Sequence, residues 1–95
     1  MAMKFAIEYH VDVIKKDIPK LAKRKKEQIK FAIEEKLTKH PDVFGIPLRR
    51  SLKGYRKLRV GDYRIVFRIE KSKVKIFLIQ HRSVVYKYAG TRGAE

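Results

Sequence analysis

The residues of this sequence that are best suited to chemistry are cations on two consecutive strand-like segments. Side chains alternate across a strand, so Lys57 and Arg59 share one face of the first segment, and Arg64 and Arg68 share one face of the second. Guanidinium groups are planar, carry several donors and match phosphate geometry well. Four cations on one face of a hairpin predict a site for a phosphate-bearing ligand. The alternative is a solvated face whose long side chains splay apart.

The register of that hairpin follows from the dipeptide Gly61-Asp62, whose leading glycine suits a two-residue type II′ turn. Such a turn places Val60 opposite Tyr63 and Arg59 opposite Arg64. Like charges that face each other destabilise a sheet by about 0.2–1 kcal/mol per pair. We expect no acidic side chain of either strand on that face to offset this cost, which favours an anionic ligand.

The C-terminal end adds candidate groups. His81 and Arg82 leave the last strand-like segment, and Tyr86 follows closely. A strand end that delivers these side chains beside Lys57 and Arg64 would bring cations and a possible proton acceptor to one point. Each also has a structural alternative: Tyr86 could pack under the C-terminal segment, His81 could cap the strand edge, and Arg82 could be an exposed charge.

Two further features could assist nucleic-acid binding. Tyr55, together with Phe77 and Ile79 of the next strand, could offer stacking surface for bases. The run KRKK at 23–26 is a second basic cluster, either a solvated helix surface or an auxiliary phosphate contact. Contacts to a phosphate backbone position a protein without reading bases, so neither basic cluster predicts sequence specificity by itself.

Composition bounds the class of protein. The 95 residues hold 25 Lys and Arg against 10 Asp and Glu, a formal net charge of +15, and 44% of them are hydrophobic. We therefore expect one domain over 1–95 with a single core, because this apolar fraction is too high for a disordered tail. Zero cysteines exclude disulfides, thiolate nucleophiles and Cys-based zinc sites, and the three histidines lack metal-ligand spacing, so we expect no metal site. Because apolar runs fall short of the roughly 18 residues of a membrane span, we expect a soluble, cytoplasmic protein without a membrane partner.

A small α+β fold must position these groups. The chain is expected to form, in order, a strand over 3–9, helices over 11–17 and 19–39, a loop over 41–51 and strands over 55–60, 63–70 and 74–81. Asp12 is the expected N-cap of the first helix, and Pro19 suits the first turn of the second. We expect the helices to cover one face of a three-stranded antiparallel meander, which leaves the cations on the other face.

Several stretches of the chain resemble the RelE branch of the RelE/ParE toxin superfamily. They are 45–48 (GIPL), 52–64 (LKGYRKLRVGDYR) and 81–86 (HRSVVY), with 17–21 and 32–37 upstream. The resemblance covers roughly residues 4 to 88 in the right order and spacing. It implies a RelE-like fold and the toxin of a type II toxin–antitoxin pair, neutralised by a cognate antitoxin protein.

The resemblance also implies an activity and a site. RelE-like toxins bind the ribosome, with its 16S rRNA, and cut mRNA in the A site without a metal or other cofactor. The ribose 2′-OH attacks the neighbouring phosphorus and leaves a 2′,3′-cyclic phosphate and a free 5′-OH. By this resemblance Arg64 holds the scissile phosphate, and Lys57 stabilises charge or assists proton transfer. Arg82 or His81 supplies a cation for the phosphorane or leaving group, and Tyr86 helps to activate the 2′-OH or stacks on a base. The expected RNA-binding residues are Lys53, Tyr55, Arg56, Arg59 and Arg68.

Two other functions stay open. A ParE-like member would bind DNA gyrase and inhibit it without hydrolysis, and a plain nucleic-acid-binding module would have lost the activity. A gyrase inhibitor has no need of Lys57, Arg64, Arg82 and Tyr86 together, so their joint presence favours RNA cleavage. Cleavage of this kind needs no nucleophile from the protein, only alignment of the 2′-OH and stabilisation of the developing charge.

Overall fold

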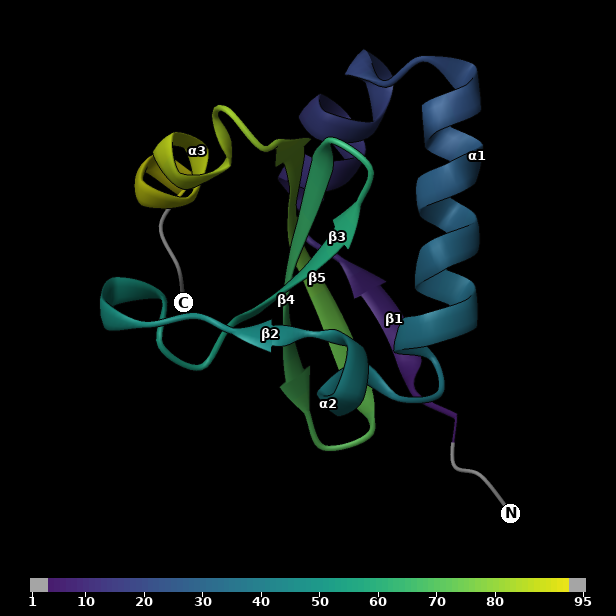
Figure 1. Ribbon diagram of the computed structural model, residues 1–95, viewed down its shortest axis with the longest axis vertical. Helices are drawn as coiled ribbons and strands as arrows, with labels where there is room; N and C mark the ends of the chain where they lie inside the picture. Colours follow the sequence, from purple (N-terminus) through teal and green to yellow (C-terminus); the bar gives the residue numbers. More distant parts are fainter. Residues whose placement is uncertain (1–3, 93–95) are drawn as a thin grey trace.

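The computed structural model describes residues 4–92 of the chain (Figure 1). Within this range five strands form one sheet in the order β1-β5-β4-β3-β2. The strands are β1 (Ala6–Tyr9), β2 (Ile46–Pro47), β3 (Arg56–Val60), β4 (Tyr63–Glu70) and β5 (Lys73–His81). β1 is parallel to β5 and all other neighbours are antiparallel, so the N-terminal strand extends the predicted meander. Met3, where that strand was predicted to begin, lies outside the described residues.

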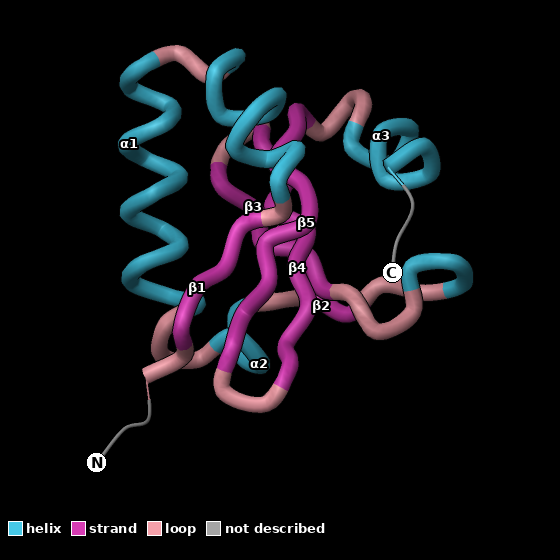
Figure 2. Tube along the Cα trace, turned by 180° about the vertical axis from the view of Figure 1, so that it is seen from behind, coloured by secondary structure: helices cyan, strands magenta, loops and turns pink. Residues whose placement is uncertain are grey.

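Helical segments lie on both sides of this sheet, which confirms the α+β class but not the prediction of a single helical layer. The segments are η1 (Val13–Asp17), η2 (Ile18–Lys20), α1 (Lys23–Ala32), η3 (Ile33–Leu37), α2 (Pro41–Phe44), η4 (Arg50–Leu52) and α3 (Val85–Arg92). α1 runs along one side of the sheet and α3 lies on the opposite side (Figures 1 and 2). Of the helices in residues 4–92, none combines the length and the apolar character that crossing a membrane requires.

The second helix begins later than predicted. Pro19 lies in the short helix η2, which directly continues η1 and ends the first helical segment. Within η2 it occupies the first turn, a position that tolerates proline. Leu21 and Ala22 then have extended backbones, with ψ angles of 137° and 149°, so that α1 begins at Lys23. The prolyl residue therefore ends the first segment instead of opening the second.

A histidine caps the first helical segment. Nδ1 of His10 accepts the backbone N–H of Asp12 (3.0 Å), and the His10 carbonyl oxygen accepts that of Val13 (2.9 Å). The prediction of Asp12 as the N-cap was wrong, because its own backbone is already helical and its side chain accepts no capping hydrogen bond. Farther along, the predicted loop over 41–51 contains α2, β2 and η4.

The β3–β4 hairpin has the predicted register. Val60 pairs with Tyr63 and Arg59 with Arg64, and Gly61 has a φ of +59°, as the first central position of a type II′ turn requires. The apolar face of the hairpin packs against the helices on the α1 side. This first core contains Val13, Leu21, Ile29, Ala32, Ile33, Leu37, Leu58, Val60, Ile65, Phe67, Val74, Ile76 and Ile79.

A β-bulge interrupts the alternation of β5. Val66 pairs with Leu78 while Phe67 pairs with Ile76, so Phe77 is the extra residue. Because of this bulge, Phe77 and Leu78 lie on the same face of the sheet, whereas Ile76 before them and Ile79 after them lie on the other face. The bulge thus adds a second apolar surface to the face that carries the cations.

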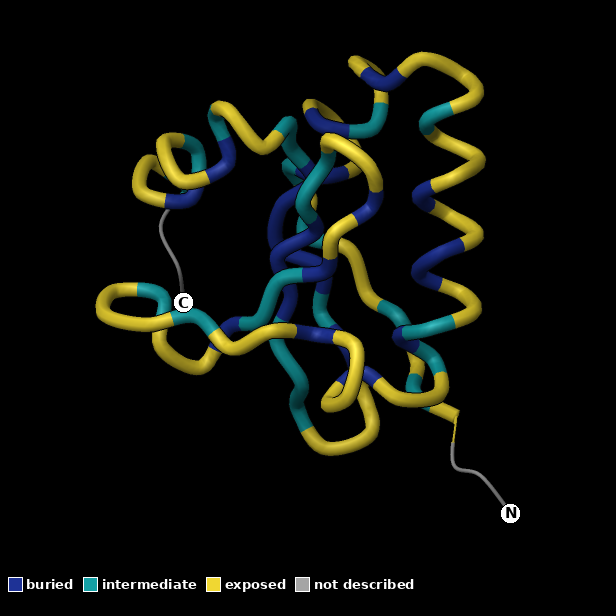
Figure 3. The backbone as a smooth tube through the Cα atoms, viewed as in Figure 1, coloured by how far each residue is buried: buried dark blue, intermediate teal, exposed yellow. Residues whose placement is uncertain are grey.

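That surface forms a second core beneath α3 (Figure 3). Its buried members are Tyr55, Val66, Phe77, Leu78, Val85 and Ala89. The predicted base-stacking surface of Tyr55, Phe77 and Ile79 was wrong, since these side chains are 6%, 5% and 2% exposed. Tyr55 and Phe77 lie in the second core, and the bulge places Ile79 in the first.

Gly45 provides a test of the packing between α2 and the sheet. A Cβ atom on this residue would overlap the ring of Phe67 and lie 3.0 Å from Cβ of Arg56. We expect Gly45→Ala to lower the free energy of unfolding by about 1–3 kcal/mol, because overpacking forces its neighbours to move. Chemical denaturation measures the effect.

Gly90→Ala is the matched control. Apart from its chain neighbours and the backbone of its own helix, no heavy atom of residues 4–92 would lie within 4 Å of its Cβ, and alanine is favoured over glycine within a helix by about 1 kcal/mol. This variant should be at least as stable as the parent. Equal stability of Gly45→Ala and the parent would contradict the packing described above.

Candidate active site

β3 and α3 bring Lys57 and Tyr86 into contact. Nζ of Lys57 donates a hydrogen bond to the hydroxyl oxygen of Tyr86 (2.9 Å) and lies 5.6 Å from the centroid of its ring. Tyr86 is 52% exposed and Lys57 is partly exposed, so a ligand can reach both side chains. Because Lys57 donates to the phenol oxygen, the hydroxyl hydrogen remains available for another partner.

Two arginines converge on the turn between β3 and β4. Nη1 of Arg64 donates to the carbonyl oxygens of Gly61 (3.0 Å) and Tyr63 (2.9 Å). The backbone N–H of Arg82 donates to the carbonyl oxygen of Asp62 (2.8 Å), and its Nε lies 3.9 Å from Oδ1 of the same residue. The end of β5 therefore places Arg82 at the turn to which the Arg64 side chain is bound.

A lysine of the predicted KRKK run reaches the same turn. Nζ of Lys25 lies 3.6 Å from the position that a Cβ on Gly61 would occupy. Arg59, which is exposed, faces Arg64 one residue pair below the turn. We call these cations, from α1, β3, β4 and the end of β5, the turn cluster: Lys25, Arg59, Arg64 and Arg82.

His81 lies apart from this arrangement. It pairs with Tyr63, and the two rings meet edge to face with centroids 5.6 Å apart. Its Nδ1 lies 2.8 Å from Oγ of Ser83 and accepts the Ser83 backbone N–H (3.1 Å). Tyr63 packs against the first core, so the structure places His81 on the side of the sheet opposite Lys57. Of the two predicted sources of a C-terminal cation, Arg82 is the one at the turn cluster.

The expected RNA-binding residues separate into exposed and structural ones. Lys53 and Arg59 are exposed. Arg56 points to the other face of β3, where its Nη1 donates to the carbonyl oxygens of Asp42 (3.2 Å) and Gly45 (3.0 Å). The structure therefore gives Arg56 the role of fastening α2 to the sheet edge.

Tyr55 and Arg68 form a second structural group with an acid that the prediction overlooked. The guanidinium of Arg68 lies 5.4 Å from the Tyr55 ring centroid, its Nη1 lies 3.4 Å from the phenol oxygen, and its Nη2 is paired with Glu70. The expectation of a face without acids was wrong, because Glu70, the last residue of β4, alternates onto the side of Arg68. A hydrogen bond from Lys75 (3.3 Å), followed by the charge of Arg68, holds the pKa of Glu70 below its ordinary value.

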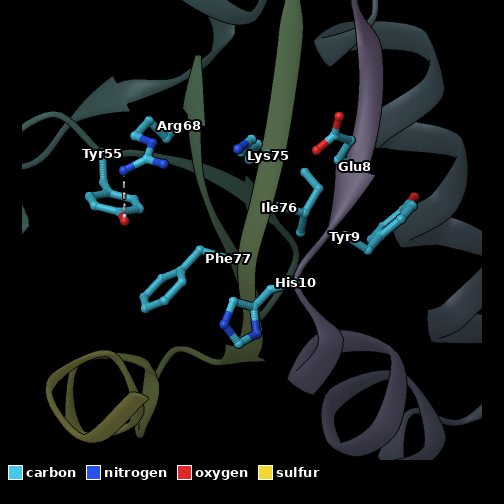
Figure 4. Close-up of a pocket in the computed structure, with 8 residues that line it drawn as sticks. All are labelled: Glu8, Tyr9, His10, Tyr55, Arg68, Lys75, Ile76 and Phe77. Atoms are coloured by element: carbon cyan, nitrogen blue, oxygen red, sulfur yellow. Dashed lines mark hydrogen bonds between the residues drawn. The ribbon is translucent and has the colours of Figure 1, made fainter. Parts of the chain in front are cut away.

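A cavity of about 190 Å³ opens beside this group, away from the Lys57–Tyr86 pair (Figure 4). Phe77 forms its floor, with ring centroids 5.2 Å from Tyr55 and 5.7 Å from His10. Burial raises the pKa of Tyr9 at the far wall, and the carboxylate of Glu34 adds to this shift. Among residues 4–92, no group of three or more histidine or acidic side chains is arranged to hold a metal ion.

The sequence prediction missed a buried ion pair beneath α3. Nη1 and Nη2 of Arg92 donate to the two carboxylate oxygens of Asp17 (2.7 and 2.9 Å). The backbone N–H of Ile79 (2.9 Å) and Nε2 of Gln80 (2.8 Å) donate to the same carboxylate. The side chains of Asp17 and Arg92 are 0% and 5% exposed. No local pattern joins residues so far apart in the chain, so the sequence carried no signal of this pair.

Comparisons with known proteins agree with this fold. The family model described as the ParE toxin of the type II toxin–antitoxin system parDE matches residues 7–86. The chain is similar to Toxin RelG of Mycobacterium tuberculosis, with 38% identity over 61 residues, which is 62% of this chain and 69% of RelG.

Solved structures show the same similarity. The crystal structure of the toxin–antitoxin complex RelBE2 from Mycobacterium tuberculosis gives a TM-score of 0.79 at 28% identity, over 85% of this chain and 94% of that one. The RelB–RelE complex from Methanococcus jannaschii gives 0.65 at 22% identity, over 85% and 96% of the two chains. The second likeness shows the fold alone.

The charge on Glu70 can be tested by pH. Because its pKa is lowered in the folded state, the ionised group stabilises the fold above its unfolded-state pKa, and this contribution is lost as the pH falls through the folded-state pKa. Glu70→Gln should therefore melt at a lower temperature than the parent at neutral pH, and the difference should narrow below about pH 4. Thermal unfolding across this range measures it. A difference in melting temperature that stayed constant with pH would show that the charge of Glu70 does not stabilise the fold.

Proposed function

The chain belongs to the family of ParE toxins of type II toxin–antitoxin systems, within the RelE/ParE superfamily, and from this premise we propose that it is a RelE-branch, ribosome-dependent endoribonuclease that cleaves mRNA. The observation that carries the proposal is the contact between Lys57 and Tyr86 next to the turn cluster. Lys57 and Arg64 are diagonal neighbours on paired strands, and the Cα atoms of such neighbours are typically about 7–8 Å apart. One phosphodiester group can therefore contact both side chains.

The chemistry requires only groups that this site contains. The O2′–P bond forms, the P–O5′ bond breaks, the 2′-OH loses a proton and the 5′-oxygen gains one. We assign Tyr86 to the 2′-OH, with Lys57 stabilising negative charge on either the phenol oxygen or the phosphate. Arg64 and Arg82 stabilise the charge that develops on the non-bridging oxygens, and preorganised donors of this kind lower a barrier by about 3 kcal/mol each.

Arg64 can perform this role without leaving its position on the turn. Its Nη1 is bound to the Gly61 and Tyr63 carbonyl oxygens, but a guanidinium group has five N–H donors in a fixed fork. The contacts to the turn orient the fork, and the remaining donors can bind phosphate oxygens. We assign the second cation to Arg82 and not to His81, since His81 lies on the opposite side of the sheet.

A cognate antitoxin is the proposed protein partner, and the ribosome with its mRNA is the proposed target. Two of the similar solved structures are complexes of a toxin with an antitoxin. A chain with a net charge of +15 associates quickly with an acidic partner, because complementary charge raises the association rate. The same charge favours binding to ribosomal RNA.

The proposal predicts a hierarchy of cleavage rates on programmed ribosomes. Arg64→Ala should reduce the single-turnover rate by about 10²–10³-fold while the protein stays folded, because a donor to the developing charge is lost. Tyr86→Phe should reduce it by about 10²-fold or more, since proton transfer is impaired. Mapping of mRNA 5′ ends by primer extension measures both.

His81→Ala is the control for these variants and should lose much less activity. Full activity of Arg64→Ala would remove this residue from the site. Inhibition of gyrase supercoiling without mRNA cuts would support the ParE-like alternative, and the absence of both activities would support a plain binding module.

RNA affinity offers a separate prediction, based on two arginines on opposite faces of β3. Arg59→Ala should reduce the slope of log affinity against log salt concentration by about 0.7, the value for one phosphate contact with a single strand. Arg56→Ala should leave the slope unchanged and lower the melting temperature, because Arg56 binds the carbonyl oxygens of Asp42 and Gly45. Fluorescence anisotropy with a short RNA measures the slopes. Equal slopes for the two variants would contradict the assignment of these faces.

A further inference from the structure

α3 contacts the sheet through one stripe of side chains. Val85, Ala89 and Arg92 are spaced four and three residues apart, so they lie on the same face of the helix. Val85 is 1% exposed, Ala89 is 2% exposed and the Arg92 side chain is 5% exposed. The apolar part of this stripe consists of Val85 and Ala89, and the partly buried Tyr88 packs against the same core beside them. The third position is an arginine, which makes a directional contact.

The contacts of Arg92 define its orientation closely. Its fork binds both oxygens of Asp17, and Nη1 also donates to the carbonyl oxygen of Phe77 (3.1 Å), the extra residue of the bulge. Its Nε lies 3.7 Å from Oδ2 of Asp12. A bidentate guanidinium–carboxylate pair fixes an angle as well as a distance. The end of α3 is therefore held in a defined direction against η1 and β5.

The opposite end of α3 is attached through the turn that leaves β5. The backbone N–H of Val84 donates to the carbonyl oxygen of His81 (3.0 Å), and Tyr86 follows at the second position of the helix. The rise from Val85 to Arg92 is about 10 Å. Ala89 and Tyr88 hold the middle of the helix by apolar contacts, which are not directional, whereas a directional anchor at the far end also restricts rotation and tilt.

We propose that Arg92 is a positioning residue, whose ion pair with Asp17 sets the rotation of α3 and so holds the Tyr86 hydroxyl at Lys57. Tyr86 adjoins the buried stripe and is itself half exposed, so the rotation of the helix decides whether its oxygen stays 2.9 Å from the ammonium group. The inference rests on the proposed function for its effect on cleavage, but the placement of Tyr86 is independent of that activity.

A double-mutant cycle on programmed ribosomes tests the effect on cleavage. Arg92→Ala should lower the single-turnover rate at saturating ribosome concentration at least tenfold and leave the half-saturating concentration unchanged. In a Tyr86→Phe background, Arg92→Ala should lower the rate by less than twofold, because its effect passes through the Tyr86 hydroxyl. Equal losses in both backgrounds would overturn the proposal, since a general loss of stability would act in both.

Two further variants separate position from charge and folding. Lys87→Ala removes the same charge from an exposed site on the same helix and should keep the maximal rate. Arg92→Lys keeps a cation beside Asp17, and so the fold, but loses the fork. Its rate should lie between those of Arg92→Ala and the parent. Thermal unfolding checks that each variant is folded. If Arg92→Ala is not folded, the cleavage rate of Arg92→Lys tests the proposal in its place. A parental rate in Arg92→Lys would then overturn the proposal.

NMR provides the measurement that needs no ribosome. A nuclear Overhauser contact between the Tyr86 ring and the Lys57 side-chain methylenes should be present in the parent and weakened in Arg92→Lys. If the parent does not cut mRNA, the proposed function fails while this contact still tests the positioning. If the contact is unchanged in the Arg92 variants, the positioning role is wrong whatever the activity.

Discussion

The carboxylate of Asp17 is the point on which three separate parts of the molecule meet. It accepts hydrogen bonds from Arg92 of α3, from the backbone of Ile79 and from the side chain of Gln80, while Asp17 itself ends η1. Burying two charges costs several kcal/mol per ion, so such a pair persists only where its geometry is good and its remaining lone pairs are satisfied. Both conditions hold here. This polar contact therefore joins the N-terminal helical segment directly to the C-terminal helix across the bulged strand. The two apolar cores pack η1 and α3 against β5 from opposite sides of the sheet, and they do not join these two helical segments to each other.

On the face of the sheet that carries the cations, the balance of positive and negative charge changes along the strands. At the end of the sheet with the β4–β5 turn, Glu70 pairs with Arg68 and Lys75, and Glu8 pairs with Lys73. At the end of the sheet with the β3–β4 turn, Oδ1 of Asp62 lies 3.9 Å from Nε of Arg82, one of the four cations of the turn cluster. The acids thus offset the cations far from α3 and leave an excess of positive charge where Tyr86 lies. A phosphate is attracted to the end of the sheet that holds the proposed chemistry, because the opposite end is largely neutralised.

The sequence predicted what local rules determine and failed where distant residues decide. The register of the hairpin was correct, because a two-residue turn with glycine first has few alternatives. The faces of β3 and β4 followed from alternation. β5 was harder, since the run 76–79 is apolar throughout and a bulge within it leaves no trace in the pattern. α3 is short and contains Gly90, and its contact with Asp17 spans most of the chain, so neither was predicted. The proximity of Lys57 and Tyr86 depends on that helix, so the position of Tyr86 just after the last strand indicated a candidate but left open whether it packs under the C-terminal segment, and the resemblance supplied its role.

The facing pair of Arg59 and Arg64 shows how the fold maintains an unfavourable arrangement. Their repulsion costs about 0.2–1 kcal/mol. On the opposite face of the same strands, Leu58 and Ile65 are 3% and 0% exposed, and burial of each stabilises the fold by about 1.5–3 kcal/mol. A slip of the register by one residue would reverse the faces, placing arginines in the first core and leucine in water. Burial therefore exceeds the repulsion and holds the cations together before any ligand arrives. Donors fixed in this way need no rearrangement when charge develops on a phosphate, which is the condition under which electrostatic stabilisation is most effective.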